Sequence, residues 1–335
     1  MPGSRSKEDS SITGECQVGT VGSTGVKVLE PCLDSRSLSL AREIADTAGR
    51  REHGPVRKAF VRSDGDGVRA ALAQLVGVGG RGGEVPVKLM LALLWRCSAD
   101  PFDTDISARK WAAVLALPAP NAGGARRVTD AMQTLARLNL VRITPHRGEA
   151  STVQLLQEDG SGEAYTLPST AYTRAAKEER NQHLYFKVPT PLWTNGHLQA
   201  MSMPALSMLL ILLAEEGADS RELWWSTETF PSRYSISPAT RAKGTRELIG
   251  RRLLYVKKRL VTDSPHQTRS FSRERVRNVY QLINDATVPS PPDILVTKAL
   301  ESATRKPRSR RPRKSPSPTS TTTRRETVAD HGHQH

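Results

Sequence analysis

The same order of predicted elements occurs twice in the chain, over about residues 85–156 and 203–283. Each stretch begins with an apolar helix and continues with a second helix, a turn, a third helix and two β-type segments. The apolar positions of the two first helices recur at helical spacing, at Val87, Met90, Leu91 and Leu94 and at Ala205, Met208, Leu209 and Leu212. This repetition predicts a mainly helical α+β protein with two similar units, each long enough for its own core.

The two third helices are predicted to have an apolar side and a polar side. In the first unit the segment GGARRVTDAMQTLARL places four residues inward, namely Val128, Ala131, Met132 and Leu135, and four outward, namely Arg126, Arg127, Asp130 and Gln133. In the second unit Ser237 is the expected N-cap, with Pro238 at the first helical position. The inward residues expected there are Ala242, Thr245, Ile249 and Leu253.

The remaining elements of each unit follow from caps, turns and alternating patterns. Second helices are predicted over 108–117, after the N-cap Ser107, and over 227–234. Paired β segments are predicted over 140–144 and 151–156, and over 254–260 and 276–283. The loop of the second pair carries further arginines, at Arg269, Arg273 and Arg275.

This order of elements resembles the winged helix-turn-helix family, through TFPSRYSISPATRAKGTRELIGRRLLYV in the second unit and WAAVLALPAPNAGGARRVTDAMQTLARLNLVRI in the first. The resemblance implies a DNA-binding protein whose third helix enters the major groove and whose wing contacts the backbone or the minor groove. Two such units in tandem are similar to the replication initiators of plasmids. The sequence departs from the family at Asn139 and Arg252, where glycine often precedes the wing. Since Arg adopts left-handed geometry poorly, the turn into the second wing is expected to differ.

The charge of the chain supports a polyanionic partner, because 49 basic minus 34 acidic residues leave a net charge of +15. Nine basic residues between Arg233 and Arg259 are opposed only by Glu247. The residues expected to reach base edges in the second unit are Thr240, Arg241, Lys243 and Gly244. Arg241 suits bidentate pairing with guanine, and Gly244 would let the helix backbone approach DNA closely.

The phosphate contacts expected in the second unit come from Arg251, Lys257 and Lys258. In the first unit the corresponding DNA-binding candidates are Arg126, Arg127 and Gln133, whereas Asp130 would repel phosphate. A solvated helix face with no ligand is the simpler alternative for all of these side chains.

The sequence divides into segments of different composition. Residues 1–35 are predicted to be disordered, and residues 36–80 to hold short helices and a loop of unknown role. The first winged helix unit is placed at 81–160, a linker with a packing strand at 161–199, and the second unit at 200–286. Residues 287–335 form a Pro-, Ser- and Arg-rich basic tail that is expected to be disordered.

We expect no catalytic site, no cofactor site and no metal site in this chain. The chain has no phosphate-binding loop of the form GxxxxGK[ST] and no nucleophile elbow, and its clustered histidines occur only in the terminal HGHQH. The longest apolar run, Met208 to Ala214, covers about two helical turns, too few for a bilayer. We therefore expect a cytoplasmic, nucleoid-associated protein that is not an enzyme and has no membrane or small-molecule partner.

The predicted function is sequence-specific binding of double-stranded DNA, as in a plasmid-type replication initiator. A transcriptional regulator with tandem winged helices is an alternative, since both classes use the same base contacts. A non-catalytic protein-interaction scaffold is a second alternative. In tandem arrangements one unit can instead serve dimerisation, so a homodimer is also considered.

Overall fold

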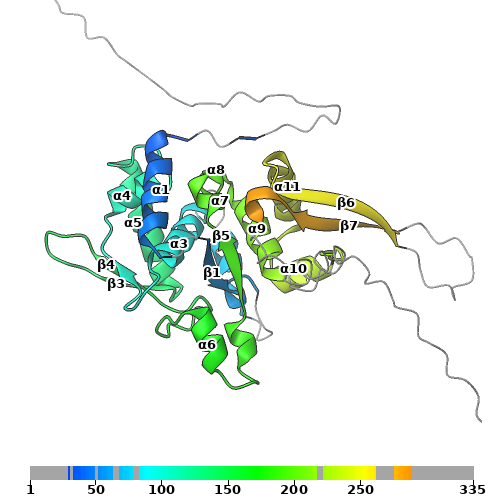
Figure 1. Cartoon of the computed structure of the whole chain (residues 1–335), viewed down its shortest axis with the longest axis horizontal. Coiled ribbons are helices and arrows are strands. Elements are labelled where there is room, and N and C mark those ends of the chain that lie inside the picture. Colours follow the sequence, from blue (N-terminus) through cyan, green and yellow to red (C-terminus); the bar gives the residue numbers. More distant parts are fainter. Residues whose placement is uncertain are drawn as a thin grey trace, which may run out of the picture. The chain divides into compact units, whose positions relative to one another are not determined.

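The structure is a computed structural model that describes residues 29–30, 33–49, 52–62, 68–77, 83–216, 222–261 and 275–287. Within these residues it is a mixture of helices and strands, as expected for an α+β protein (Figure 1). Most of the predicted N-terminal segment, the loop 262–274 and all but the first residue of the basic tail lie outside the described residues. The end of the N-terminal segment makes a contact, because the Leu29 N–H donates to the Gly250 carbonyl at 2.9 Å.

The first half of the chain contains most of the short elements. Its helices are α1 (Ser35–Thr47), α2 (Ala71–Gly77), α3 (Glu84–Arg96), α4 (Ala108–Val114), α5 (Gly123–Arg137) and α6 (Pro168–Arg174). Its strands are β1 (His53–Arg57), β2 (Asp103–Thr104), β3 (Val141–Thr144) and β4 (Thr152–Leu155). Two turns of 3-10 helix cover Lys58–Phe60 and Arg180–His183.

The second half begins with a strand and two helical turns. The elements are β5 (Tyr185–Pro189), α7 (Pro191–Thr194), α8 (His197–Ala200), α9 (Met203–Glu215), α10 (Thr229–Tyr234), α11 (Pro238–Gly250), β6 (Leu254–Val261) and β7 (Arg275–Leu282). A 3-10 turn, Asn284–Ala286, follows. The predicted third helices and both hairpins are confirmed to within a few residues.

The two halves share one order of elements, which includes a strand that was not predicted. In the first, β2 lies between α3 and α4 and pairs with β4, giving the sheet order β2-β4-β3. In the second, Leu223 lies between α9 and α10 and forms an antiparallel bridge with Tyr280 of β7. Both halves therefore run helix, extended segment, helix, helix, hairpin, and the extended segment, a strand in the first half and a single bridge in the second, pairs with the last strand.

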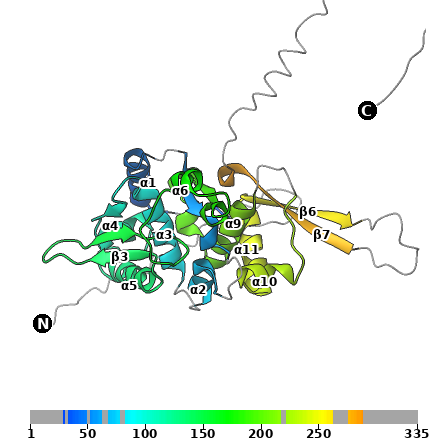
Figure 2. The same cartoon turned by 90° about the horizontal axis from the view of Figure 1, so that it is seen from below.

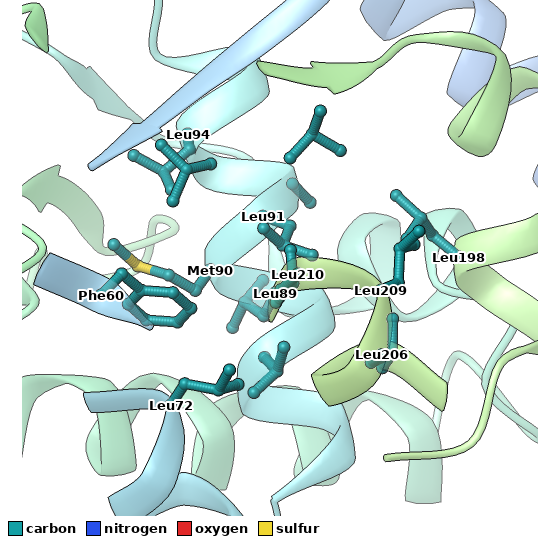
Figure 3. Packing of buried hydrophobic residues seen from close by; sticks show 14 of the residues in the cluster. Phe60, Leu72, Leu89, Met90, Leu91, Leu94, Leu198, Leu206, Leu209 and Leu210 are labelled. Carbon is teal, nitrogen blue, oxygen red and sulfur yellow. The ribbon is translucent and has the colours of Figure 1, made fainter. Parts of the chain in front are cut away.

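The buried residues form one continuous core and not one core for each half. Leucines of α3, including Leu89 and Leu91, face leucines of α9, including Leu206 and Leu210 (Figure 3). The helices α3 and α9 are apolar nearly all round, so each buries residues against its own half and against the other. Although each unit is long enough for a core of its own, the buried residues of the two halves therefore pack as one.

The predicted linker contributes to this shared core. Its strand β5 packs against α9, as expected, and also pairs antiparallel with β1, from Val56 opposite Phe186 to His53 opposite Pro189. The N-cap of α1 is Asp34, whose carboxylate accepts from the Arg36 N–H at 3.1 Å. Ser37 is buried and donates to the Val114 carbonyl at 2.9 Å. Residues 36–80 thus belong to the packed structure.

Both third helices end in the same left-handed turn. Asn139 has φ 55° and Arg252 has φ 56°, and in each case the next N–H donates five residues back, to Leu135 or Leu248. The prediction that Arg252 would change the turn is wrong. Asn284 supports the unfavourable arginine by donating from its amide to the Arg252 carbonyl at 2.7 Å.

Candidate nucleic-acid interface

The helix α11 begins where the sequence predicts. The Ser237 hydroxyl accepts from the Thr240 N–H at 3.1 Å, and Pro238 occupies the first helical position, where its missing N–H costs no hydrogen bond. The Thr240 hydroxyl also lies 3.0 Å from the Ser237 hydroxyl, so this candidate residue is engaged at the cap. The start of α11 is fixed by local chemistry alone.

The inward side of α11 agrees with the prediction at Leu253, which is buried, and at Thr245 and Ile249, which are half-buried, and differs from it elsewhere. Gly244 and Leu248 are buried, whereas Ala242, which was expected inside, is exposed. A Cβ on Gly244 would lie 2.1 Å from the Pro204 carbonyl oxygen of α9. The proposal that Gly244 lets the helix approach DNA is therefore wrong, because the close approach is between α11 and α9.

Arg251 also faces inward and not toward a ligand. Its Nε donates to Glu247 at 2.9 Å, a second guanidinium nitrogen donates to the Ala200 carbonyl, and the side chain is 8% exposed. The prediction that Arg251 contacts phosphate is wrong. The side chain has a structural role, since it donates to the carbonyl of the last residue of α8.

Glu247, the only acidic residue of α11, is held by the start of α9. Its carboxylate accepts from the Ser202 N–H at 3.1 Å and from the Ser202 hydroxyl, and it also pairs with Arg251. Ser202 is the N-cap residue of α9, where a negative charge is favoured by the helix dipole. The carboxylate is thus removed from the exposed side of α11.

The exposed side of α11 is a stripe of four residues at helical spacing, Ala239, Ala242, Lys243 and Arg246. Two are basic and two are alanines, so the stripe combines positive charge with short side chains. We call these four residues the α11 stripe. Arg246 was not among the predicted site residues. Its position three residues after Lys243, on the same side of a helix, is the sequence feature that could have identified it.

Arg241 is half-buried and turned toward aromatic side chains. Its guanidinium carbon lies 4.4 Å from the Phe230 ring centroid and 5.4 Å from that of Tyr280, and a guanidinium nitrogen donates to the Tyr280 hydroxyl at 3.0 Å. Trp225 completes the cluster by donating from Nε1 to the Tyr234 hydroxyl at 3.1 Å. Burial raises the pKa of Tyr234, so this hydroxyl stays neutral.

A groove of about 940 Å³ runs between α11 and β7. Its described lining includes three arginines, Arg241, Arg246 and Arg277, and contains no Asp or Glu. Trp224 and Trp225 lie along it as well. A groove with this lining has the charge to accept an anionic chain.

The hairpin β6–β7 carries the other predicted cations and extends away from α9 and α11 in both views (Figures 1 and 2). Lys257 and Lys258 are exposed and, as neighbours on a strand, project from opposite faces. The counterpart hairpin β3–β4 is half as long, with four paired residues against eight.

The first unit presents a different exposed stripe on α5. Gly123, Arg126, Asp130, Gln133 and Arg137 are exposed along one side of the helix. Of the predicted candidates, Arg126 and Gln133 lie on this stripe and Arg127 is half-buried beside it. Asp130 lies between Arg126 and Arg137, so the net charge of the α5 stripe is smaller than that of the α11 stripe.

Comparison of the chain with protein-family profiles, curated proteins and solved structures found no match. No described helix has both the length and the apolar character needed to cross a bilayer. Among the described residues, no group of three His, Cys, Asp or Glu side chains is arranged to hold a metal ion.

Proposed function

We propose that the two halves are winged helix-turn-helix units and that the protein binds specific double-stranded DNA through α11 and the hairpin β6–β7. The observation that carries this proposal is the α11 stripe, which offers Lys243 and Arg246 while Glu247 is bound at the start of α9. An outer side without carboxylates favours duplex binding, because phosphate oxygens flank the major groove and repel a negative charge.

The base-contacting residues proposed here are Lys243 and Arg246, which replace Gly244 and Arg251. Both can donate to the guanine O6 and N7 atoms, and the two alanines of the stripe leave room for base edges. Arg241 stays a candidate for the groove but has a competing role in the aromatic cluster. Lys257 and Lys258 are proposed phosphate contacts.

We place the activity at a replication origin of plasmid type, on the tandem order of the two units. Footprints on repeated origin sequences, together with loss of plasmid maintenance on deletion of the gene, are the expected results. Protection of a single palindrome upstream of a gene would make the protein a transcriptional regulator instead.

Duplex binding is tested with the full chain on fragments recovered by selection from genomic DNA. Lys243→Ala combined with Arg246→Ala should weaken binding by about tenfold to a hundredfold and relax the preference for the selected sequence. The matched control is Lys177→Ala with Lys187→Ala, which removes one exposed charge from the segment after α6 and one from β5. Equal effects of the two pairs would mean that the protein attracts DNA only through its overall positive charge. The absence of salt-sensitive duplex binding would favour a protein-interaction scaffold.

A further inference from the structure

The hairpin β6–β7 has a second face that lies opposite its buried side. Cross-strand partners share a face, so the pairs Leu254 with Leu282 and Val256 with Tyr280 define the buried side. The alternate pairs are Tyr255 with Gln281, Lys257 with Val279, and Arg259 with Arg277. These side chains form the outer face of the sheet.

The chain before α10 extends this outer face by one more row. The bridge from Leu223 to Tyr280 places this segment along β7, on the side away from β6. The Arg277 guanidinium carbon lies 3.8 Å from the Trp224 ring centroid, and Arg259 pairs with Glu222. Both contacts put Trp224 and Glu222 on the outer face.

Two aromatic rings on this face are accessible, at 42% for Trp224 and 54% for Tyr255. Three cations surround them, Lys257, Arg259 and Arg277, and within the described residues Glu222 is the one carboxylate among them. The Arg259–Glu222 pair is exposed on both sides, so it contributes little to stability and Arg259 can exchange its partner for a phosphate.

We propose that this outer face, made by Trp224, Tyr255, Lys257, Arg259 and Arg277, binds single-stranded DNA. Exposed aromatic rings stack on unpaired bases while flanking cations follow the phosphates, and a duplex hides the base faces that such stacking requires. The face is thus suited to a separated strand and differs from the α11 stripe, which has no aromatic residue.

The choice of DNA over RNA rests on the proposed function. Trp224 and Arg277 also border the groove beside α11, so the outer face and the groove meet at these two residues. A strand released from a duplex bound at α11 would reach the outer face directly. This continuity gives a protein that binds an origin a place to hold one strand after melting.

The test measures the affinity of the full chain for a labelled oligothymidylate by fluorescence anisotropy. Tyr255→Ala should weaken binding by about tenfold, as expected for loss of one stacked base, and Tyr255→Phe should restore it. The matched control is Tyr172→Ala, since Tyr172 is also exposed and has the Arg180 guanidinium 5.6 Å from its ring centroid, but lies on α6. Equal affinities of Tyr255→Ala and Tyr172→Ala would overturn the inference.

A variant with the opposite effect guards against misfolding as the explanation. Glu222→Gln should tighten oligothymidylate binding by about threefold, because it removes the carboxylate that competes with phosphate for Arg259. No gain in affinity would count against the inference. A preference for oligouridylate over oligothymidylate would assign the face to RNA and overturn the choice of DNA.

The two sites are separated by their own variants. Arg246→Ala should weaken duplex binding and leave oligothymidylate binding unchanged, while Tyr255→Ala should do the reverse. Duplex binding without binding of the single strand would refute this inference alone. Tyr255-dependent binding of the single strand without duplex binding would refute the proposed function alone.

Discussion

The third helices α5 and α11 occupy the same place in the order of elements, yet their outer sides differ. On α5 the exposed stripe mixes Arg126 and Arg137 with Asp130, and on α11 it contains only alanines and cations. The difference arises because the Glu247 carboxylate accepts from the start of α9, whereas the Asp130 side chain is exposed to solvent. A helix can thus gain a cationic outer side by turning its acidic residue inward as well as by carrying basic ones.

The largest expected effect concerns the glycines that bring each third helix close to its neighbour. Gly244→Ala should reduce the free energy of unfolding by about 3 kcal/mol, because the new Cβ meets backbone oxygen. Gly124→Ala should cost less, about 1–2 kcal/mol, since its Cβ would lie 2.9 Å from the Pro118 oxygen and not 2.1 Å from Pro204. Urea denaturation measures both, with Gly123→Ala as the control that has open space. Equal losses at Gly124 and Gly244 would show that the two third helices tolerate an added Cβ equally well.

The arginines near the starts of the two helices should differ in their effect on stability. Arg241→Ala should lower the free energy of unfolding by about 1–2 kcal/mol, because it removes a hydrogen bond to Tyr280 and the contact with the Phe230 ring. Arg126→Ala, on an exposed side, should change it by less than about 0.5 kcal/mol. Thermal unfolding of the two variants decides. An unchanged Arg241→Ala protein would mean that the guanidinium is free for DNA.

The left-handed turns after the two helices offer a smaller and opposite effect. Arg252→Gly should raise the free energy of unfolding by about 0.5–1 kcal/mol, because glycine relieves the left-handed strain that an arginine side chain carries. Asn139→Gly should change little, since asparagine tolerates this conformation. A gain at Asn139 as large as that at Arg252 would show that the two turns are under the same strain. Both are measured by urea denaturation.

The smallest effect tests whether α5 lies near phosphates at all. Asp130→Ala should raise duplex affinity by about threefold if the first unit contacts DNA, because one repulsive charge is removed. Titration of the selected fragment at low salt gives the value. An affinity equal to that of the wild type would confine duplex binding to the second unit.

The extent of sequence-based prediction differs between local and long-range features. The cap Ser237 with Pro238 fixed the start of α11, and the inward residues of α5 were all correctly predicted, because caps and amphipathic spacing act within a few residues. On α11 the prediction was right for Thr245, Ile249 and Leu253 and wrong for Ala242, which is exposed. The helix turns Gly244 toward α9 instead. Its orientation depends on where α9 allows close approach, which no local pattern records.

The sequence predicted the elements of the candidate site and some of its residues. The sequence correctly pointed to α11 and β6 as strongly basic elements, with Lys243, Lys257 and Lys258 exposed. It misassigned Gly244 and Arg251, which face α9 and α8, and its site residues did not include Arg246 or Trp224. The exposure of Trp224 follows from the bridge between Leu223 and Tyr280, a contact between residues far apart in the chain.

Local sequence was sufficient to predict the three helices and the hairpin of each half, their order, and the large positive charge of the chain. These properties follow from propensity, capping and periodicity, which need only neighbouring residues. The tertiary structure alone decided that α3 and α9 share one core, and which of the charged residues of α11 face solvent. Such choices depend on close packing between elements distant in sequence, where a single missing Cβ at Gly244 sets the orientation of the whole helix.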